Sequence, residues 1–383
     1  MEIHLDKTLD VAVVERQLAE LWKKTSGERE PDSEEALLRA RVANLLVFVA
    51  SDASLDQAQQ MMRELTAIHP SRVLMMLGDR DAADRDIDMY VASFCHSDKR
   101  AGTRRLSCEE VILKAQGKFV AELPSAALPL AVPDLSTFLW WRDALRVSDK
   151  VFEILVRRTD RLVIDSAEFT DPAFELLETN KLFTQETWKP LGISDINWAR
   201  LTLWRALLAD FYDVPAYQQW LQKIDHVKID YVRSELAPAA VVPHAFLFAG
   251  WLGSRLGWTL ASDVASRHED ETISFKLSSR RGATITLELN RVETGERKPG
   301  RLANVELRCS VKDSAAFIVT RSADNLHVLA EATVGQHTHR GRVLPVRNRS
   351  AAHLLGREME ILCNDDVYEE AVRMAQQLVE AMK

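Results

Sequence analysis

The sequence predicts a two-domain protein, with an α/β domain in its N-terminal half and an α+β domain in its C-terminal half. A length of 383 residues suits two domains. The first half alternates continuous apolar runs with helical periodicity, which is typical of βαβ units in a mixed sheet. The second half carries short alternating runs between helices, which is typical of an antiparallel meander with flanking helices. We therefore predict an N-terminal helix and linker over 1–35, an α/β domain with a bridging helix over 36–222, and an α+β domain over 223–383.

The N-terminal segment is predicted to be helical, because Val14, Leu18 and Leu21 recur at helical spacing. The Gly27–Glu35 stretch then has the composition of a flexible linker. The first ten residues contain no apolar core of the kind a signal peptide has. The longest apolar run, Val241–Leu252, is too short to span a bilayer. We therefore expect a cytoplasmic protein without a membrane segment.

A βαβ unit opens the α/β domain. The continuous apolar run Asn44–Ala50 predicts a strand buried on both faces. A helix follows, and it ends at His69-Pro70-Ser71 because proline disfavours helix at the residue before it. Arg72–Leu77 is the next strand, which the crossover makes parallel to the first. Further segments of this domain are predicted at Ile87–Cys95, Arg104–Leu113, Leu128–Val132, Thr137–Trp141 and Arg161–Asp165, with an amphipathic helix at Asp195–Phe211.

The second half has a different pattern of apolar and polar residues. Val227–Val232 is predicted to be a strand and Pro243–Leu256 a buried helix. The helices Ala351–Cys363 and Asp366–Met382 are expected to close the domain. Between them, the short turns of five alternating runs indicate an antiparallel meander: Thr272–Leu277, Thr284–Val292, Ala303–Val311, Phe317–Arg321 and Leu326–Ala332.

Composition excludes several classes of protein. The net charge of −8 and the pI of about 5.8 argue against a nucleic-acid-binding protein, which would present a concentrated basic face. The four cysteines are too few and too scattered for a disulfide framework, and no CxxC pair suggests a zinc ribbon. We therefore expect neither a structural metal nor a nucleic-acid partner.

No phosphate-binding loop is recognisable. The sequence lacks GxxxxGK[ST], and the first βα turn, Ala50–Ala53, contains no glycine to cradle a pyrophosphate. The glycines Gly250, Gly253 and Gly257 lie inside an apolar helix, where close helix packing explains them better. We therefore expect no nucleotide cofactor.

Catalytic motifs are also missing. There is no GxSxG elbow, and a triad of His69, Ser71 and Asp52 would rest only on a common helix-ending tripeptide. His337 and His339 share one side of a strand or loop without an acid or cysteine at ligand spacing. Surface histidines are therefore favoured over a metal site.

Cys95 and Cys108 form a possible redox pair. If the turn between their strands is centred on Ala101-Gly102, the two residues face each other in an antiparallel pair. Two small buried residues on adjacent strands are the alternative that a cytosolic protein favours.

Tryptophan is the least usual feature of the composition. Several of the nine tryptophans stand beside arginine or aspartate, as in PDLSTFLWWRD and DINWARLTLWR. Tryptophan and arginine are enriched in binding hot spots, but they also form ordinary cores with buried ion pairs. Both interpretations stay open.

The same segments resemble the glucose-6-phosphate dehydrogenase assembly protein (OpcA) family. The matching stretches span about positions 40–210 in the family's order, and fewer can be quoted in the C-terminal half. They are RVANLLVFVA, HPSRV, CEEV, LPLAVPDLSTFLWW, RLVIDS and DINWARLTLWR.

The resemblance implies a non-catalytic assembly factor and allosteric activator. Such a protein binds glucose-6-phosphate dehydrogenase and favours its active oligomer at the entry to the oxidative pentose phosphate pathway.

The alternative is a sugar-phosphate- or nucleotide-binding regulator, or a cryptic enzyme, that uses the edge of the N-terminal sheet. In this alternative, Ser71 and Arg72 would contact the phosphate. Seven residues are candidates for the partner interface or its supporting framework: Arg72, Trp140, Trp141, Trp198, Arg200, Trp204 and Arg205.

Overall fold

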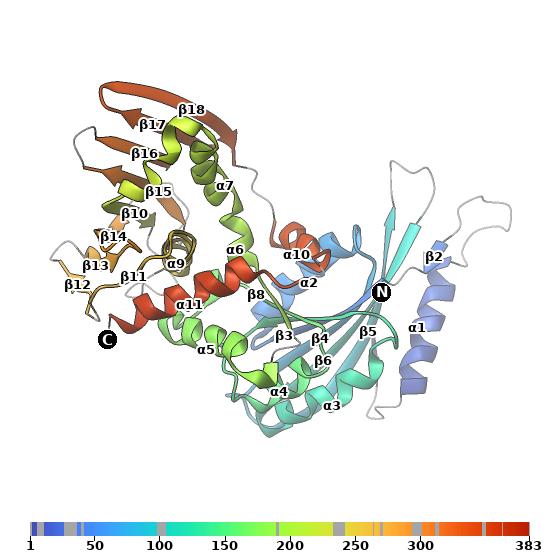
Figure 1. The fold of residues 1–383 in the computed structure, drawn as a ribbon. Coiled ribbons are helices and arrows are strands. Elements are labelled where there is room, and N and C mark those ends of the chain that lie inside the picture. Colours follow the sequence, from blue (N-terminus) through green and yellow to red (C-terminus); the bar gives the residue numbers. More distant parts are fainter. Residues whose placement is uncertain are drawn as a thin grey trace. The chain divides into compact units, whose positions relative to one another are not determined.

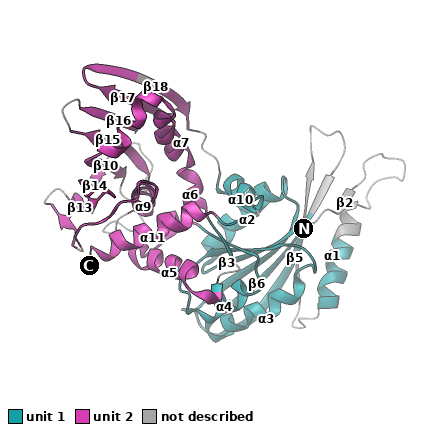
Figure 2. Cartoon of the chain, in the orientation of Figure 1, with its two compact units in different colours: residues 1–164, 188–194, 349–364 teal, residues 165–187, 195–348, 365–383 magenta. Residues whose placement is uncertain are grey.

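A computed structural model of the chain confirms the predicted fold class of each half. The chain forms two compact units, which are described separately (Figure 2). Unit 1 comprises residues 1–164, 188–194 and 349–364, and unit 2 comprises residues 165–187, 195–348 and 365–383. This division differs from the predicted boundary at residue 222, because segments distant in sequence fold into the same unit. The structure describes residues 2–5, 11–26, 37–39, 42–97, 105–188, 191–232, 242–262, 264–268, 271–292, 301–310, 314–346, 350–361 and 363–382.

Unit 1 is built on a mixed sheet in the order β1-β5-β6-β4-β3-β7-β8-β9, with β2 beside β6 (Figure 1). The strands β4, β3, β7 and β8 run parallel, whereas β5 is antiparallel to β6. Every residue of β3 is buried, as its continuous apolar run predicts. The strands are β1 (Glu2–Leu5), β2 (Leu37–Arg39), β3 (Ala43–Val49), β4 (Ser71–Asp79), β5 (Arg85–Ser97), β6 (Arg105–Gln116), β7 (Thr137–Arg142), β8 (Arg161–Ile164) and β9 (Gly192–Asp195).

Helices cover both faces of this sheet (Figure 1). Helix α2 packs on β3 and β4 and is backed by α10, which the sequence had placed in the second domain. The predicted buried segment Leu128–Val132 begins with a 3-10 turn, Leu128–Leu130, in which Leu130 is buried. The helices of unit 1 are α1 (Val11–Ser26), α2 (Asp52–Thr66), η1 (Gly117–Glu122), α3 (Leu123–Ala127), η2 (Leu128–Leu130), α4 (Lys150–Val156) and α10 (Ala351–Met359).

Unit 2 contains a second sheet in the order β11-β13-β14-β10-β15-β16-β17-β18, with β12 beside β13. The predicted meander is present from β15 to β18, but β10 inserts beside β14 in parallel. The strands are β10 (His226–Val232), β11 (Thr259–Leu260), β12 (Ser266–Arg267), β13 (Ile273–Ser278), β14 (Thr284–Val292), β15 (Leu302–Cys309), β16 (Ala315–Arg321), β17 (His327–Val334) and β18 (His337–Pro345).

Helices α7 and α9 pack on this second sheet, and α11 packs on α9. The predicted helix Asp195–Phe211 is divided at Leu201 into α6 and α7. The helices are α5 (Pro172–Thr184), α6 (Ile196–Arg200), α7 (Thr202–Asp210), α8 (Pro215–Gln218), α9 (Pro243–Leu256) and α11 (Asp366–Glu380). The 3-10 turns are η3 (Ser166–Glu168), η4 (Glu186–Trp188), η5 (Phe211–Asp213) and η6 (Leu221–Lys223). The last residue of η4, Trp188, belongs to unit 1. Within the described residues, no helix combines the length and apolar character needed to cross a bilayer.

Close contact between α9 and α11 depends on Gly250. A Cβ atom at this position would lie 2.2 Å from the backbone oxygen of Ala371, so one helix would have to move. We expect Gly250→Ala to lower the free energy of unfolding by about 1–3 kcal/mol through overpacking. Urea unfolding measures this, with Gly282→Ala as a control for backbone strain, since Gly282 has open space around it but a positive φ. An unchanged midpoint for Gly250→Ala would show that the two helices can separate freely.

Candidate functional site

In open α/β sheets, ligands bind at the carboxyl ends of the parallel strands, and unit 1 has such an edge. Helix α2 starts there, and the side chain of Ser51 caps it by accepting a hydrogen bond from the Ser54 amide at 3.3 Å. Asp52, in the first turn, forms an ion pair with Lys114 at 3.0 Å. A carboxylate in this place repels a phosphate, and the turn contains no glycine. The usual dinucleotide cradle is therefore not formed at this turn.

The arginines at this edge are engaged with protein groups. Arg80 forms ion pairs with Asp143 and, at 2.7 Å, with Asp149. Arg142 donates to the Ser54 carbonyl and lies over the Trp140 ring, 4.8 Å from its centroid. These guanidinium groups support the loops at the edge of the sheet.

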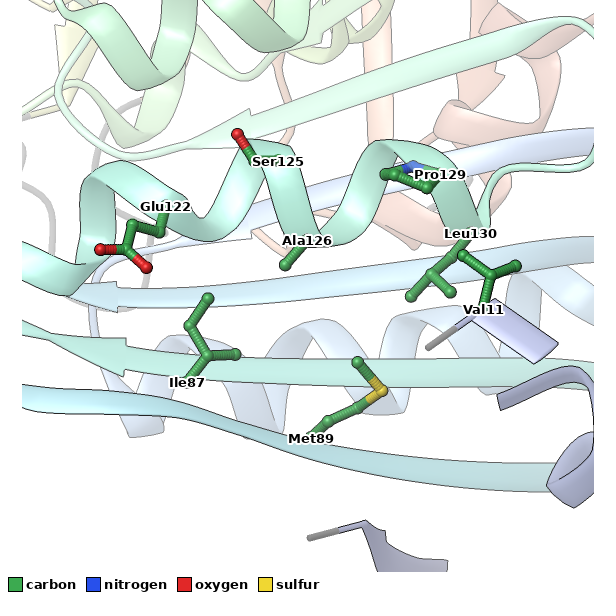
Figure 3. Close-up of a pocket in the computed structure, with 8 residues that line it drawn as sticks. All are labelled: Val11, Ile87, Met89, Glu122, Ser125, Ala126, Pro129 and Leu130. Carbon is green, nitrogen blue, oxygen red and sulfur yellow. The ribbon is translucent and has the colours of Figure 1, made fainter. Parts of the chain in front are cut away.

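A shallow apolar hollow of about 190 Å³ lies between β5, α3 and the start of α1 (Figure 3). Its polar lining consists of Glu122 and Ser125, whereas Ile87, Met89 and Leu130 point into it. Two polar side chains are too few to orient a sugar phosphate. Within the described ranges, no three His, Cys, Asp or Glu side chains stand close enough to hold a metal ion.

Arg72 is a framework residue of unit 1. It lies at the amino end of β4 with 2% of its surface exposed, so it and Ser71 stand at the end of the strand opposite the carboxyl edge. Its guanidinium donates to Glu109 at 2.6 and 3.0 Å, to Glu15, and to the Leu130 carbonyl at 3.0 Å. The predicted use of Ser71 and Arg72 as phosphate contacts at the sheet edge is therefore wrong.

Trp140 and Trp141 on β7 are also core residues, with 0% and 2% of their surfaces exposed. The Trp141 ring stacks on Phe48 with centroids 4.4 Å apart and meets Phe152 edge-on. Core packing, the alternative that the sequence left open, accounts for both tryptophans.

The cysteine register differs from the expected one by a single residue. In the β5–β6 ladder, Cys108 is paired with Phe94 and Cys95 with Ser107. Since successive residues of a strand point to opposite faces, Cys95 and Cys108 do not face each other as predicted. The thiol of Cys108 lies 3.4 Å from the carbonyl oxygen of Thr66, and the side chain of Cys95 lies outside the described residues.

A buried polar network in unit 2 joins two of the quoted sequence motifs, RLVIDS and DINWARLTLWR. The Asp195 carboxylate, 1% exposed, accepts hydrogen bonds from the amide and hydroxyl of Ser166 and from the Asn197 amide at 2.6–3.0 Å. Tyr368 donates its hydroxyl to the same carboxylate at 3.1 Å. Burial, and to a smaller extent the negative charge of the nearby Asp165, raises the pKa of Asp195 to about 6. No local pattern of sequence points to Asp195, because its partner Tyr368 is 173 residues away in the chain.

The remaining candidates surround this network in unit 2. Arg200 forms a bidentate ion pair with Asp165 at 2.6 and 2.7 Å. The guanidinium of Arg205 lies 3.4 Å from the ring centroid of Trp198, which is 5% exposed. Trp204 is 3% exposed. The structure thus places five of the seven candidates in cores and leaves Arg200 and Arg205 partly exposed.

Trp198 connects this network to the last helix. Its indole N–H donates to Asp365 at 2.7 Å, and Asp365 also caps α11 at the Tyr368 amide. We expect Trp198→Phe to cost about 1.5–3 kcal/mol, because a hydrogen bond to a charged acceptor is lost. Denaturant unfolding measures the loss. Trp220→Phe is the matched control, since Trp220 is also 5% exposed and its indole N–H has no hydrogen-bond partner among the described residues. An equal loss in both variants would mean that ring volume rather than the hydrogen bond matters.

Comparison with solved structures shows the class of fold. The 3-ketoreductase KijD10 of Actinomadura kijaniata, solved with NADP and TDP-benzene, superposes with a TM-score of 0.50 at 11% identity, over 89% of this chain and 96% of that one. This similarity concerns the fold alone. The chain thus has a fold similar to that of the reductase, and its own first βα turn contains Asp52 and no glycine.

Sequence comparison identifies the family. The family model described as the glucose-6-phosphate dehydrogenase subunit N-terminal domain matches residues 62–181, and the one described as its C-terminal domain matches residues 191–372. The chain belongs to the OpcA family of glucose-6-phosphate dehydrogenase assembly proteins.

Curated relatives agree with the family models. The OxPP cycle proteins OpcA of Synechococcus elongatus and Synechocystis sp. are each 25% identical, over 79% and 80% of this chain. The chain spans 66% and 63% of the lengths of these two relatives.

Proposed function

We propose that this protein is a non-catalytic assembly factor that binds glucose-6-phosphate dehydrogenase and favours its active oligomer. The observation that carries the proposal is the match of both halves of the chain to family models described as domains of a glucose-6-phosphate dehydrogenase subunit. The first βα turn supports it, because Asp52 stands where a nucleotide phosphate would otherwise approach the helix.

Activation would follow from differential binding. A protein that binds one conformation or oligomer of an enzyme more tightly than another shifts the population toward the state it prefers. A preference of a few kcal/mol is sufficient to convert a minor state into the major one. The protein would need no catalytic group of its own, and it would act in the cytoplasm, where the dehydrogenase works.

Arg200 and Arg205 are our candidates for the partner contact. Both are partly exposed, whereas Arg72 and the four candidate tryptophans are buried and would act as the framework behind the surface. Arg200 holds Asp165, so its substitution would also disturb the fold. Arg205 is therefore the better site for a variant.

Reconstitution with the dehydrogenase of the same organism tests the proposal. The two purified proteins are mixed, complex size is followed by light scattering, and NADPH formation is followed over a range of glucose 6-phosphate concentrations. Co-elution with a lower KM or a higher rate is the expected result. Absence of both a complex and a kinetic change would contradict the proposal.

Variants then locate the contact. We expect Arg205→Ala to weaken the complex, and urea unfolding of the variant separates this effect from the loss of the contact between Arg205 and Trp198. Arg373→Ala is the control, because Arg373 forms a comparable local contact with Glu369 on α11. NADPH formation by this protein alone, without the dehydrogenase, would show an enzyme and overturn the non-catalytic part of the proposal.

A further inference from the structure

Strand β18 lies at one end of the sheet in unit 2. Within the part of the chain that the structure describes, it pairs only with β17 (Figure 1). Alternate residues of an edge strand point their N–H and C=O groups away from the sheet, so such a strand can pair with another chain. The side chains of His337, Thr338 and His339 are exposed, and Val343 is 56% exposed. The outer edge of β18 is therefore accessible to a further strand.

The segment that contains β18 is basic, although the protein as a whole is acidic. Residues 335–350 include four arginines and two histidines and no aspartate or glutamate, whereas the whole chain has a net charge of −8. Two acids lie against this strand on its inner side, Glu331 on β17 and Asp210 on α7, which packs on β17. Asp210 pairs with Arg342 at 2.7 Å, but the pair is exposed, and a guanidinium with five donors can also donate to a second carboxylate. A strand that approaches from outside therefore meets positive charge first.

An apolar groove of about 310 Å³ lies beside β18 within unit 2. Ala330 and Ala332 on β17 and Gly341 on β18 line it on the side of the sheet, and their small size leaves the space open. Phe211 and Tyr217 line it on the side of the helices. A Cβ atom at Gly341 would lie 2.9 Å from the backbone oxygen of Ala330, so the two strands approach too closely there for a side chain. The groove is therefore a consequence of small residues at the edge of the sheet.

A bulge in the edge strand brings a basic side chain to this groove. The register between β17 and β18 shifts between Leu329 and Glu331, so that Gly341 and Arg342 together stand opposite one residue of β17. Bulges change the direction in which a side chain points. Arg342 accordingly lines the groove, as does His339 from the regular part of β18. The groove thus combines an apolar interior with basic side chains from the edge strand.

We propose that β18 and this groove bind an extended, acidic segment of the dehydrogenase as a further strand of the sheet. This inference rests on the proposed function, which supplies the partner. Main-chain hydrogen bonds along β18 would hold the segment, an apolar side chain would fill the groove, and acidic side chains would meet Arg342 and His339. Helix α7 connects this surface to the candidate contact at Arg205, since Leu207 and Asp210 of the same helix line the groove.

A second copy of this chain is a poorer occupant. Two β18 strands side by side would place the basic side chains of one copy against those of the other, and like charges directly opposite each other destabilise a sheet. Charged side chains on edge strands generally prevent pairing between identical edges. Because residues 335–350 contain no acid, this edge disfavours its own copy and favours an acidic strand.

Binding of the full chain to the dehydrogenase tests the inference. Arg342→Glu should weaken the complex about tenfold or more, because like charges that face each other across an interface repel. Arg267→Glu is the matched control, since Arg267 is exposed on β12 at the opposite end of the same sheet. His339→Glu should also weaken binding, and it serves if Arg342→Glu fails to fold. The wild-type affinity should fall as salt is raised, and more steeply than that of Arg342→Glu.

Hydrogen exchange measures the addition of a strand directly. Amides of β18 should exchange more slowly in the complex, because alternate ones gain a hydrogen-bond acceptor, whereas those of β12 should be unchanged. If Arg342→Glu and Arg267→Glu bind equally, or if exchange in β18 is unaffected, the inference is wrong while the proposed function stands. A dimer of this chain that Arg342→Glu abolishes would make a second copy the occupant and would also overturn it. Absence of any complex with the wild-type chain would contradict the proposed function as well.

Discussion

Replacing Asp195 by alanine should lower the free energy of unfolding by at least about 3 kcal/mol, whereas Asp195→Asn should leave it nearly unchanged or raise it at pH 8. Alanine removes the acceptor for four donors: the amide and hydroxyl of Ser166, the Asn197 amide and the Tyr368 hydroxyl. Each buried donor left without a partner costs about 1–3 kcal/mol. Chemical denaturation at fixed pH measures the difference.

Asparagine can satisfy the same network because its donors divide into two kinds. The two backbone amides meet Oδ1 of Asp195, and the two hydroxyls meet Oδ2. An asparagine keeps the carbonyl oxygen for the amides and presents its NH₂ group to hydroxyls that can rotate to accept. Equal destabilisation by alanine and asparagine would show that the negative charge itself is required.

The pH dependence of stability gives a second readout. Burial and the Asp165 carboxylate raise the pKa of Asp195 to about 6, above its ordinary value of 3.8. Between these two values the folded state holds a proton that the unfolded state has lost, so this group makes stability fall as pH rises from about 4 to 6. The slope should be absent in Asp195→Asn, and a wild-type profile parallel to that of the variant would contradict the assignment.

Arg72→Met should lower the free energy of unfolding by about 3–5 kcal/mol. The substitution leaves the Glu109 carboxylate, 3% exposed, without the guanidinium that compensates its charge. Burial lowers the pKa of Arg72, but the hydrogen bonds and charges of Glu15 and Glu109 outweigh it and raise this pKa above its ordinary value, so the charge is present throughout the accessible pH range. Circular dichroism during urea unfolding is a suitable measurement.

A double variant distinguishes the contribution of the ion pair to stability from that of side-chain packing. Arg72→Met combined with Glu109→Leu removes both charges and should recover most of the lost stability, because a buried pair can be replaced by apolar groups at little net cost. Arg157→Met is the control, since its partner Glu153 is exposed and such pairs contribute about 0–1 kcal/mol. Failure of the double variant to recover stability would mean that the aliphatic stem of Arg72 is what matters.

Local patterns predicted most of the secondary structure. The apolar run Asn44–Ala50 and the helix that follows it define a βαβ unit because their periodicity is local. The alternation in Phe317–Arg321 similarly predicts a half-buried strand. For Leu128–Val132, the apolar run indicated only a buried segment, because it gives no sign that Pro129 belongs to a 3-10 turn.

The sequence by itself determined the two fold classes, the glycine-free first βα turn and the resemblance to the family. These depend on residues within a few positions of one another, so periodicity and residue type are sufficient. The tertiary structure alone decided that Arg72 and the candidate tryptophans belong to cores and that Asp195 meets Tyr368. Burial and charge at these positions arise from contacts between residues far apart in the chain, which no local pattern of sequence encodes.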